Sequence, residues 1–388
     1  MKVTRVVYID YNFIDSRYPN KPEDGDRFYT YGFGSLYARQ FKKYNPDIHV
    51  ECWKADPRTE WRKEKDIEGV IYRMFPSTSI SKIGQYSRQM TEFLRCYKSH
   101  HPDAVFNISS FDHVLFYSLS FHLKKNKLVV QHHGESTATY KFATRKGFSK
   151  LYWALRIPIE RMALKNIKLV YMLDTRIEKW LPGNIKKKIL RTTGVDENIF
   201  YPISKEDARE QLSLRKDNRY LLYVGRLNIT KHPEILIKVF NDLKNTYSDL
   251  ELILAGSEKK DPFYRNAEDS GARIYGVILN TELYKFLSAA DVYVLPKLDE
   301  SIPFGGIGML SVQALLCNTP IVGSTVEAFP VEDRDNVGIV ADDYESIKNA
   351  VTAILEKKKS FSSMRDLAIK HYSWEKISMK TYQDYLTL

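Results

Sequence analysis

Two cationic side chains follow a strand-like segment in the second half of the chain. Residues 220–224 are apolar and are followed by Gly225, Arg226 and then Lys231. A planar guanidinium and an ammonium at a turn between strand and helix can neutralise a pyrophosphate. The same spacing also fits two exposed cations at an ordinary helix start. The motif therefore indicates an anion site without requiring one.

A glycine-rich stretch further along leads into a segment with helical character. Gly305, Gly306, Ile307 and Gly308 precede Met309 and the apolar run that follows it. Glycines let backbone N–H groups approach a ligand closely, and a helix N-terminus favours an anion. We interpret the stretch as a second group of phosphate contacts, although a glycine-rich loop alone is a weak signal.

The first half carries two further candidate segments. Gly32 and Gly34 come just before a run with helical spacing, where they fit either backbone contacts to the same phosphates or an ordinary tight turn. An apolar strand at 127–131 runs into His132 and His133. A histidine at a strand's carboxyl end can hydrogen-bond sugar hydroxyls or a leaving oxygen. Metal binding is disfavoured because adjacent histidines face opposite ways in an extended chain.

The elements that must position these residues alternate along the first half. Strands are predicted at 3–9, 48–53, 70–75, 104–108, 127–131, 168–173 and 188–192, and helices at 81–99 and 149–165. Such alternation is typical of a doubly wound α/β domain.

The same pattern restarts after a proline-containing, charged stretch at 194–217, which we interpret as a linker. Strands are predicted at 220–224, 250–255, 273–275, 292–295 and 321–322, and helices at 232–246, 281–290, 308–317 and 344–357. Two facing Rossmann-like domains predict a ligand in the cleft between them, at the carboxyl ends of the strands.

Composition limits the class of protein. The 388 residues are 43% hydrophobic and 28% charged, which suits two packed domains and excludes overall disorder. Three distant cysteines argue against a disulfide framework or a zinc site and favour a reducing cytoplasm. The N-terminus does not resemble a signal peptide, and the uncharged stretch 301–326 is too broken by prolines and glycines to predict a spanning helix.

The positive charge is concentrated in the first half. Residues 1–200 hold 35 Lys and Arg against 21 Asp and Glu, a net charge of +14, whereas residues 201–388 hold 24 against 27, a net charge of −3. This asymmetry fits a surface that meets an anionic membrane, and the alternative is a solvated basic surface with no partner. A nucleic-acid partner is disfavoured, because the aromatic-plus-basic motifs of the known binding modules are missing.

Taken together, these residues resemble glycosyltransferase family 4, a retaining family with the GT-B fold. The resemblance covers most of the chain and is best from about 190 to 388. It rests on co-linear segments: Gly194–Asp196, Tyr223–Leu227 with Lys231, Leu254–Gly256, Ile274–Val277, Ala290–Pro296, Ala314–Val322 and Tyr372–Trp374. In the first half, His133 resembles the family histidine that lies against the donor sugar, and Gly32 and Gly34 resemble its glycine-rich first loop.

The resemblance implies that Arg226 and Lys231 bind the phosphates of a nucleotide sugar, and that the backbone near Val277 meets the base. The chain departs from the family where two glutamates eight positions apart are usual, because Gly305 and Gln313 occupy these positions. Gln313 keeps a hydrogen-bonding head for ribose hydroxyls, whereas Gly305 offers only backbone. Glu300 is therefore our candidate for the missing carboxylate.

We expect the GT-B fold, with an acceptor-side domain at 1–200, a nucleotide-sugar-binding domain at 201–370 and a helix at 371–388 that packs back on the first domain. The expected activity is retaining transfer from a nucleoside diphosphate sugar to a glycan or lipid-linked acceptor, in cell-surface polysaccharide or glycoconjugate synthesis. The predicted catalytic residues are His133, Arg226, Lys231 and Glu300. The predicted donor-binding residues are Gly32, Gly34, Gly225, Val277, Gly305, Gly306, Ile307, Gly308, Met309 and Gln313.

The expected reaction needs no cofactor and no metal, and the leaving phosphate helps to deprotonate the acceptor. We expect the protein in the cytoplasm, held peripherally at the inner face of the membrane. Two alternatives stay open: a non-catalytic nucleotide-sugar-binding protein on the same fold, and a sugar-nucleotide epimerase or hydrolase. UDP, GDP and ADP donors fit the sequence equally well, because the base is read by backbone.

Overall fold

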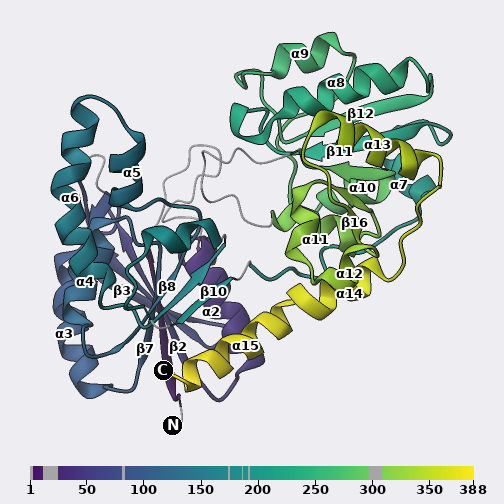
Figure 1. Ribbon diagram of the computed structural model, residues 1–388. Coiled ribbons are helices and arrows are strands. Elements are labelled where there is room, and N and C mark those ends of the chain that lie inside the picture. The colour runs from purple at the N-terminus through teal and green to yellow at the C-terminus, as the bar shows by residue number, and fades with distance from the viewer. Residues whose placement is uncertain are drawn as a thin grey trace. The chain divides into compact units, whose positions relative to one another are not determined.

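The chain folds into two compact units (Figure 1). The structure, a computed structural model, describes residues 3–11, 25–80, 84–173, 175–185, 187–190, 193–296 and 308–388. Unit 1 comprises Met1–Arg191 and Ile377–Leu388, and unit 2 comprises Thr192–Lys376. The boundary falls before residue 200, the end that we predicted for the first domain. The reason is that Phe200 lies in the apolar core of unit 2, and Val195 N donates to Tyr372 O at 2.9 Å.

Unit 1 is built on an eight-stranded sheet with the order β10-β9-β8-β7-β1-β2-β4-β3. All neighbouring strands are parallel except β3, which runs antiparallel to β4. The strands are β1 (Arg5–Tyr11), β2 (His49–Asp56), β3 (Lys63–Ile67), β4 (Val70–Pro76), β7 (Val105–Ser109), β8 (Lys127–Gln131), β9 (Leu169–Met172) and β10 (Lys187–Leu190). The strands predicted in the first half are confirmed. The sequence does not predict β3, because four of its five residues are charged.

Helices flank this sheet, together with a two-stranded sheet of β5 (Thr78–Ile80) and β6 (Gly84–Tyr86). They are α1 (Asp26–Thr30), α2 (Phe33–Tyr44), α3 (Arg88–His100), α4 (Val114–His122), α5 (Ala138–Thr144), α6 (Phe148–Leu164) and the 3₁₀ helix η2 (Thr175–Trp180). Helix α3 begins later than the predicted 81–99, because Ser87 caps it by accepting from Met90 N at 3.2 Å.

Unit 2 has a six-stranded, fully parallel sheet with the order β13-β12-β11-β14-β15-β16. Its strands are β11 (Arg219–Val224), β12 (Leu250–Ala255), β13 (Arg273–Tyr275), β14 (Val292–Val294), β15 (Ile321–Val322) and β16 (Gly338–Ile339). Its helices are α7 (Lys205–Gln211), η3 (Ile229–Lys231), α8 (Pro233–Lys244), α9 (Tyr264–Asp269), α10 (Leu283–Ala289), α11 (Met309–Leu316), η4 (Ser324–Ala328), α12 (Val331–Arg334), α13 (Tyr344–Leu355) and α14 (Met364–Tyr372). The predicted linker at 194–217 belongs to unit 2 and contains α7.

Each sheet reverses its strand order at one place. In unit 1 the chain runs outward from β1 to β2 and β4 and then returns to the other side of β1 with β7. In unit 2 the same reversal lies between β11 and β14. Loops diverge at such switch points, so open α/β sheets bind their ligands there, beyond the carboxyl ends of the strands.

The last helix, α15 (Trp374–Leu386), begins in unit 2, and its residues from Ile377 onward belong to unit 1. Tyr385 lies fully buried there, where its hydroxyl accepts from Asn107 Nδ2 at 2.7 Å. Tyr171 Oη donates to Asp384 Oδ2 at 3.0 Å. None of the described helices is both long and apolar enough to cross a membrane.

Candidate functional site

The first candidate site lies at the carboxyl ends of β11 and β12 in unit 2. Gly225 follows β11 with a φ of 140°, a conformation that favours glycine, and its N–H donates to Ala255 O at 2.7 Å. Ser257 Oγ donates to the Gly225 carbonyl at 3.0 Å, and the Tyr223 hydroxyl donates to the Arg226 carbonyl at 2.9 Å. These contacts fix the backbone of the turn that carries Arg226.

A buried carboxylate orients Arg226. The Asp261 side chain is fully buried and accepts from Arg226 Nε at 3.3 Å. It also accepts from the backbone N–H groups of Leu227 at 3.2 Å and Glu258 at 3.0 Å. The Arg226 side chain stays 48% exposed, which leaves guanidinium donors available to a ligand. Sequence reasoning missed Asp261, whose only signal is its place in the loop after β12.

Lys231, at the end of η3, is a half-buried cation beside this turn. Burial lowers the pKa of its ammonium group. Within the described ranges, the Lys231 side chain makes no hydrogen bond or ion pair. A partly desolvated charge without a counter-charge is costly, and a phosphate would supply one.

The N-terminus of α11 lies at the same edge of the unit 2 sheet. Gly308 caps the helix, and a Cβ built on it would lie 3.8 Å from Leu295 Cδ2. Leu295 follows β14, the neighbour of β11, so this helix start is near the switch point of the sheet. Met309 is half-buried in the first turn of α11, and Gln313 is buried further along it.

The other residues predicted to bind the donor in unit 2 either lie after a different strand or fall outside the residues that the structure describes. Val277 follows β13 and is 49% exposed. Glu300, Gly305, Gly306 and Ile307 lie outside the described residues. Among the residues that are described, no three His, Cys, Asp or Glu side chains gather where they could hold a metal ion.

The second candidate site is a pocket of about 680 Å³ within unit 1. Its walls come from the ends of β1, β7 and β8 and from the start of α2, which is the switch-point edge of this sheet. The lining residues are Asp10, Thr30, Tyr31, Gly32, Phe33, Leu36, Arg39, Ser109, Ser110, Asp112, His113, His133 and Glu135.

Two of the predicted residues, Gly32 and His133, meet in this pocket. Phe33 stacks on the His133 imidazole with ring centroids 4.8 Å apart and an interplanar angle of 19°. His133 Nε2 is buried and has no hydrogen-bond partner among the residues that the structure describes. Burial lowers the pKa of His133 to about 3, so the ring is neutral at pH 7. A neutral imidazole with an unsatisfied nitrogen can take a hydrogen bond from a ligand hydroxyl.

Gly34 lies in close contact with the wall of the pocket. Its N–H donates to Asp10 Oδ2 at 2.9 Å, and a Cβ at this position would lie 2.8 Å from Asp10 Cβ. Gly34 is buried and does not line the pocket, so its contribution here is close packing of α2 against the end of β1.

The carboxylates of the pocket are already engaged within unit 1. Glu135 accepts from the backbone N–H groups of Phe111 at 3.0 Å and His133 at 2.8 Å, and burial raises its pKa. Asp112 accepts from Ser110 Oγ at 2.9 Å and from Lys141 Nζ at 3.2 Å.

Arg39 extends from α2 into the same pocket, and unlike the carboxylates its side chain is not engaged by other described residues. Its Nε is buried without a hydrogen-bond partner, and its guanidinium forms no ion pair with another residue that the structure describes. Sequence reasoning missed Arg39, because spacing along a helix does not reveal that one cation faces a cavity.

Comparison with known proteins agrees with this architecture. Residues 204–371 match the family described as glycosyl transferases group 1. The D-inositol 3-phosphate glycosyltransferase of Segniliparus rotundus is 26% identical over 197 residues, which cover 47% of this chain and 43% of that protein. The protein of that name from Mycobacterium bovis (strain BCG / Pasteur 1173P2) is 30% identical over 154 residues, covering 37% of this chain and 30% of that one. The matches thus span less than half of these relatives' length.

Solved structures resemble the whole chain. Sucrose-phosphate synthase from Thermosynechococcus elongatus has a TM-score of 0.65 at 20% identity and covers 92% of this chain and 93% of that one. HepE from Anabaena, solved in complex with UDP-glucose, has a TM-score of 0.65 at 13% identity over 99% and 100%. The chain therefore has the GT-B fold of glycosyltransferases. The residues that match the glycosyl transferases group 1 family all lie in its second unit.

Proposed function

We propose that this protein is a retaining glycosyltransferase that moves a sugar from a nucleoside diphosphate sugar to a glycan or lipid-linked acceptor. The observation that carries the proposal is the pair of cations at the end of β11. Arg226 is oriented by buried Asp261 and keeps exposed donors, and Lys231 is half-buried without a partner among the described side chains. This arrangement suits a diphosphate.

In the proposed reaction the bond between sugar and phosphate breaks, and negative charge grows on the leaving diphosphate. Arg226 and Lys231 stabilise that charge, each by several kcal/mol at most, because they are aimed at it beforehand. The N-terminus of α11 at Gly308 adds backbone N–H groups at the same sheet edge. We propose that these groups of the chain are sufficient and that no divalent cation is required.

The acceptor, on this proposal, occupies the pocket of unit 1. His133 hydrogen-bonds a sugar hydroxyl as a neutral ring, and the Arg39 guanidinium suits an anionic part of the substrate. Glu135 and Asp10 both line the pocket, where Glu135 already accepts two backbone N–H groups and Asp10 accepts that of Gly34, which supports transfer without a protein nucleophile. We infer front-face transfer, in which the leaving phosphate accepts the proton of the acceptor hydroxyl and the configuration is retained.

A UDP-sugar is the first donor to test, since the HepE structure of similar fold contains UDP-glucose.

We further propose a role in cell-surface polysaccharide or glycoconjugate synthesis at the cytoplasmic face of the membrane. All three cysteines are free thiols, which is compatible with a reducing compartment.

The test is a nucleotide-release assay with UDP-, GDP- and ADP-sugars and a panel of glycan and lipid-linked acceptors, with product anomers assigned by NMR. One donor should release its nucleotide faster when the correct acceptor is present. The variant Arg226→Ala should lower turnover far more than acceptor affinity, and near-normal turnover would contradict the assignment. Binding of a nucleotide sugar without release under any condition would favour a non-catalytic binding protein.

A further inference from the structure

Helix α6 turns an apolar stripe toward solvent. Its exposed fractions are 96% for Phe148, 62% for Leu151, 69% for Leu155, 48% for Ile159 and 59% for Met162. At about 100° per residue, these five side chains fall within roughly 80° of the helix surface, along a length of roughly 21 Å. Single exposed apolar residues are ordinary, but a contiguous stripe of this kind marks an interaction surface.

The opposite face of α6 is firmly packed, so the exposure does not come from a loose helix. Arg156 and Glu160 are buried on that face. Arg156 Nη2 donates to Tyr117 Oη at 2.8 Å, and Glu160 Oε1 accepts from Ala138 N at 2.7 Å. These contacts set the rotation of α6 and hold the stripe on the outside of unit 1.

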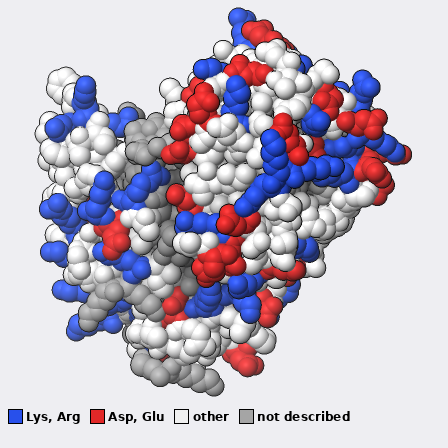
Figure 2. All heavy atoms as spheres, turned by 45° about the vertical axis from the view of Figure 1, so that its right-hand side comes forward, with Lys and Arg blue, Asp and Glu red and all other residues white. Residues whose placement is uncertain are grey.

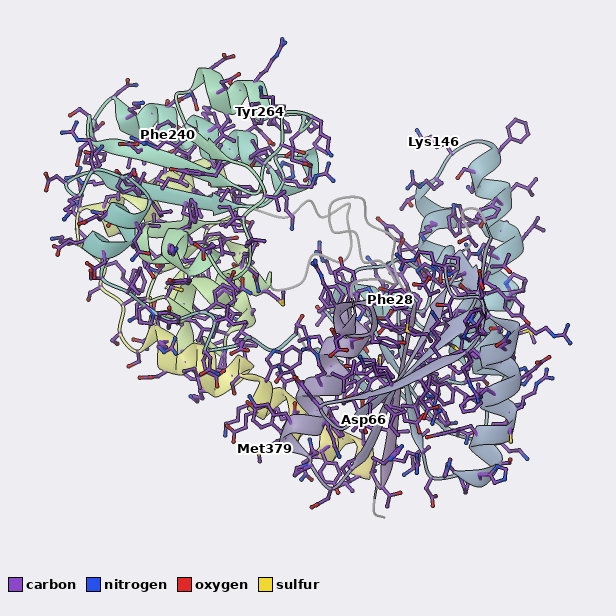
Figure 3. All side chains as sticks on the ribbon, turned by 180° about the vertical axis from the view of Figure 1, so that it is seen from behind. Phe28, Asp66, Lys146, Phe240, Tyr264 and Met379 are labelled. Carbon is purple, nitrogen blue, oxygen red and sulfur yellow. The ribbon has the colours of Figure 1, made fainter. Side chains whose placement is uncertain are left out.

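Basic side chains line one edge of the stripe: at about 100° per residue, Lys150, Arg161 and Lys165 fall on the same side of it. Between residues 138 and 168 the chain has eight Lys and Arg but one acidic residue, Glu160, which is only 1% exposed. The exposed cations are Arg145, Lys146, Lys150, Arg161, Lys165 and Lys168. Lys146 lies at the turn between α5 and α6 (Figure 3), and Lys and Arg adjoin uncharged atoms at this end of the molecule (Figure 2, upper left).

We propose that α6 docks the protein on an anionic lipid bilayer. In this arrangement the helix lies in the plane of the interface, with the stripe at the boundary of the acyl chains and the flanking cations on the headgroups. Charge decides between this partner and a second copy of the chain. Two copies meeting through α6 would bring the same cations together with no exposed acid between residues 138 and 168 to pair with them.

The docking helix is joined to the pocket of unit 1. Arg156 Nη2, from α6, donates to Asp112 O at 2.8 Å, and Lys141, from α5, pairs with the Asp112 carboxylate that lines the pocket. Attachment through α6 therefore holds the pocket close to the leaflet, which favours an acceptor carried on a lipid over a soluble one. This last step rests on the proposed function, whereas the docking itself does not.

The test is co-sedimentation of the full chain with phosphatidylcholine vesicles, with and without phosphatidylglycerol. The wild type should bind the anionic vesicles and release them as salt is raised. The variant Leu155→Ser should bind about ten-fold more weakly. Each of Lys150→Gln and Arg161→Gln should weaken binding about five-fold. The matched control Val331→Ser, an exposed apolar residue of unit 2 that is 74% exposed, should bind like the wild type.

Equal binding to neutral vesicles, or unchanged binding by Leu155→Ser, would overturn the proposal. Self-association of the wild type that Leu155→Ser abolishes, with no vesicle binding, would instead assign the stripe to a second copy. Melting temperatures of all variants, with and without nucleotide, confirm that they are folded. Vesicle binding that persists while no nucleotide shifts the melting temperature would refute the proposed transfer reaction and leave the docking standing.

Discussion

Replacing Lys231 by methionine should raise the stability of the protein while it weakens the binding of the nucleotide sugar. The methionine keeps the length of the side chain and removes a half-buried charge that has no partner among the described residues. A buried polar group left unpaired costs about 1–3 kcal/mol, so a half-buried one predicts a gain in the free energy of unfolding on the order of 1 kcal/mol. For a unit of this size that corresponds to a rise in Tm of about 2–4 °C.

The same change should weaken the binding of the nucleotide sugar. A hydrogen bond to a charged group contributes about 1.5–3 kcal/mol, which corresponds to roughly a 10- to 100-fold increase in Kd. Differential scanning calorimetry and isothermal titration measure the two effects on one sample. Lys376→Met, which removes an exposed lysine of unit 2, is the matched control and should change neither quantity.

The pH dependence of the stability gain gives a further check. The pKa of Lys231 is lower in the folded protein than its ordinary value of 10.5, so the unfolded chain holds more protons between the two values. Wild-type stability therefore rises with pH in that window, and its difference from Lys231→Met narrows. A variant that is less stable than the wild type, or that binds the nucleotide sugar equally well, would refute this account of Lys231.

Three other changes have definite expected outcomes. Gly34→Ala should lower the free energy of unfolding, measured in urea, by about 1–3 kcal/mol, because its Cβ would lie 2.8 Å from Asp10. The control Gly183→Ala, whose Cβ would have nothing within 4 Å, should have little effect. Equal losses of stability in the two variants would contradict the packing argument. In steady-state kinetics, Asp261→Asn should raise the donor KM about ten-fold with a smaller change in kcat, because Arg226 loses its charged partner. An unchanged donor KM would count against a role for the contact between Asp261 and Arg226. Burial raises the pKa of Glu160 to about 7 from 4.5, so wild-type stability falls as pH rises between these values. Glu160→Gln should therefore be more stable than the wild type by about 3 kcal/mol near pH 8 but not near pH 4. A stability difference in thermal melts that does not vary with pH would exclude the ionisation of Glu160 as its cause.

The sheet of each unit was predictable because buried parallel strands are short apolar runs, and β11 and β12 contain only one charged residue after their first positions. The rule failed at β3, where a strand at the edge of the sheet is almost entirely charged. It also failed in the expected linker, where α7 starts at a serine cap rather than at an apolar pattern.

The candidate sites were predictable to the extent that they lie at strand ends. Gly225, Arg226 and His133 each follow a predicted strand within two residues, and parallel strands bring such positions to one edge. Asp261 and Arg39 were not predictable, because their roles depend on contacts across loops that leave no local pattern. Gly34 was predicted to bring backbone close to a ligand, whereas in the structure the absence of a side chain lets it approach Asp10.

We propose that the cations after β11 hold a nucleoside diphosphate without help from a metal. A thermal-shift screen of UDP, GDP, ADP and their sugar conjugates, in EDTA and in magnesium, tests this proposal on the wild type and on Arg226→Ala. A ligand at 100 times its Kd stabilises a protein by about 2.7 kcal/mol, which such a screen detects easily. One nucleotide should raise the Tm of the wild type in EDTA, and Arg226→Ala should lose most of this shift. A shift that appears only with magnesium, or that Arg226→Ala retains in full, would contradict it.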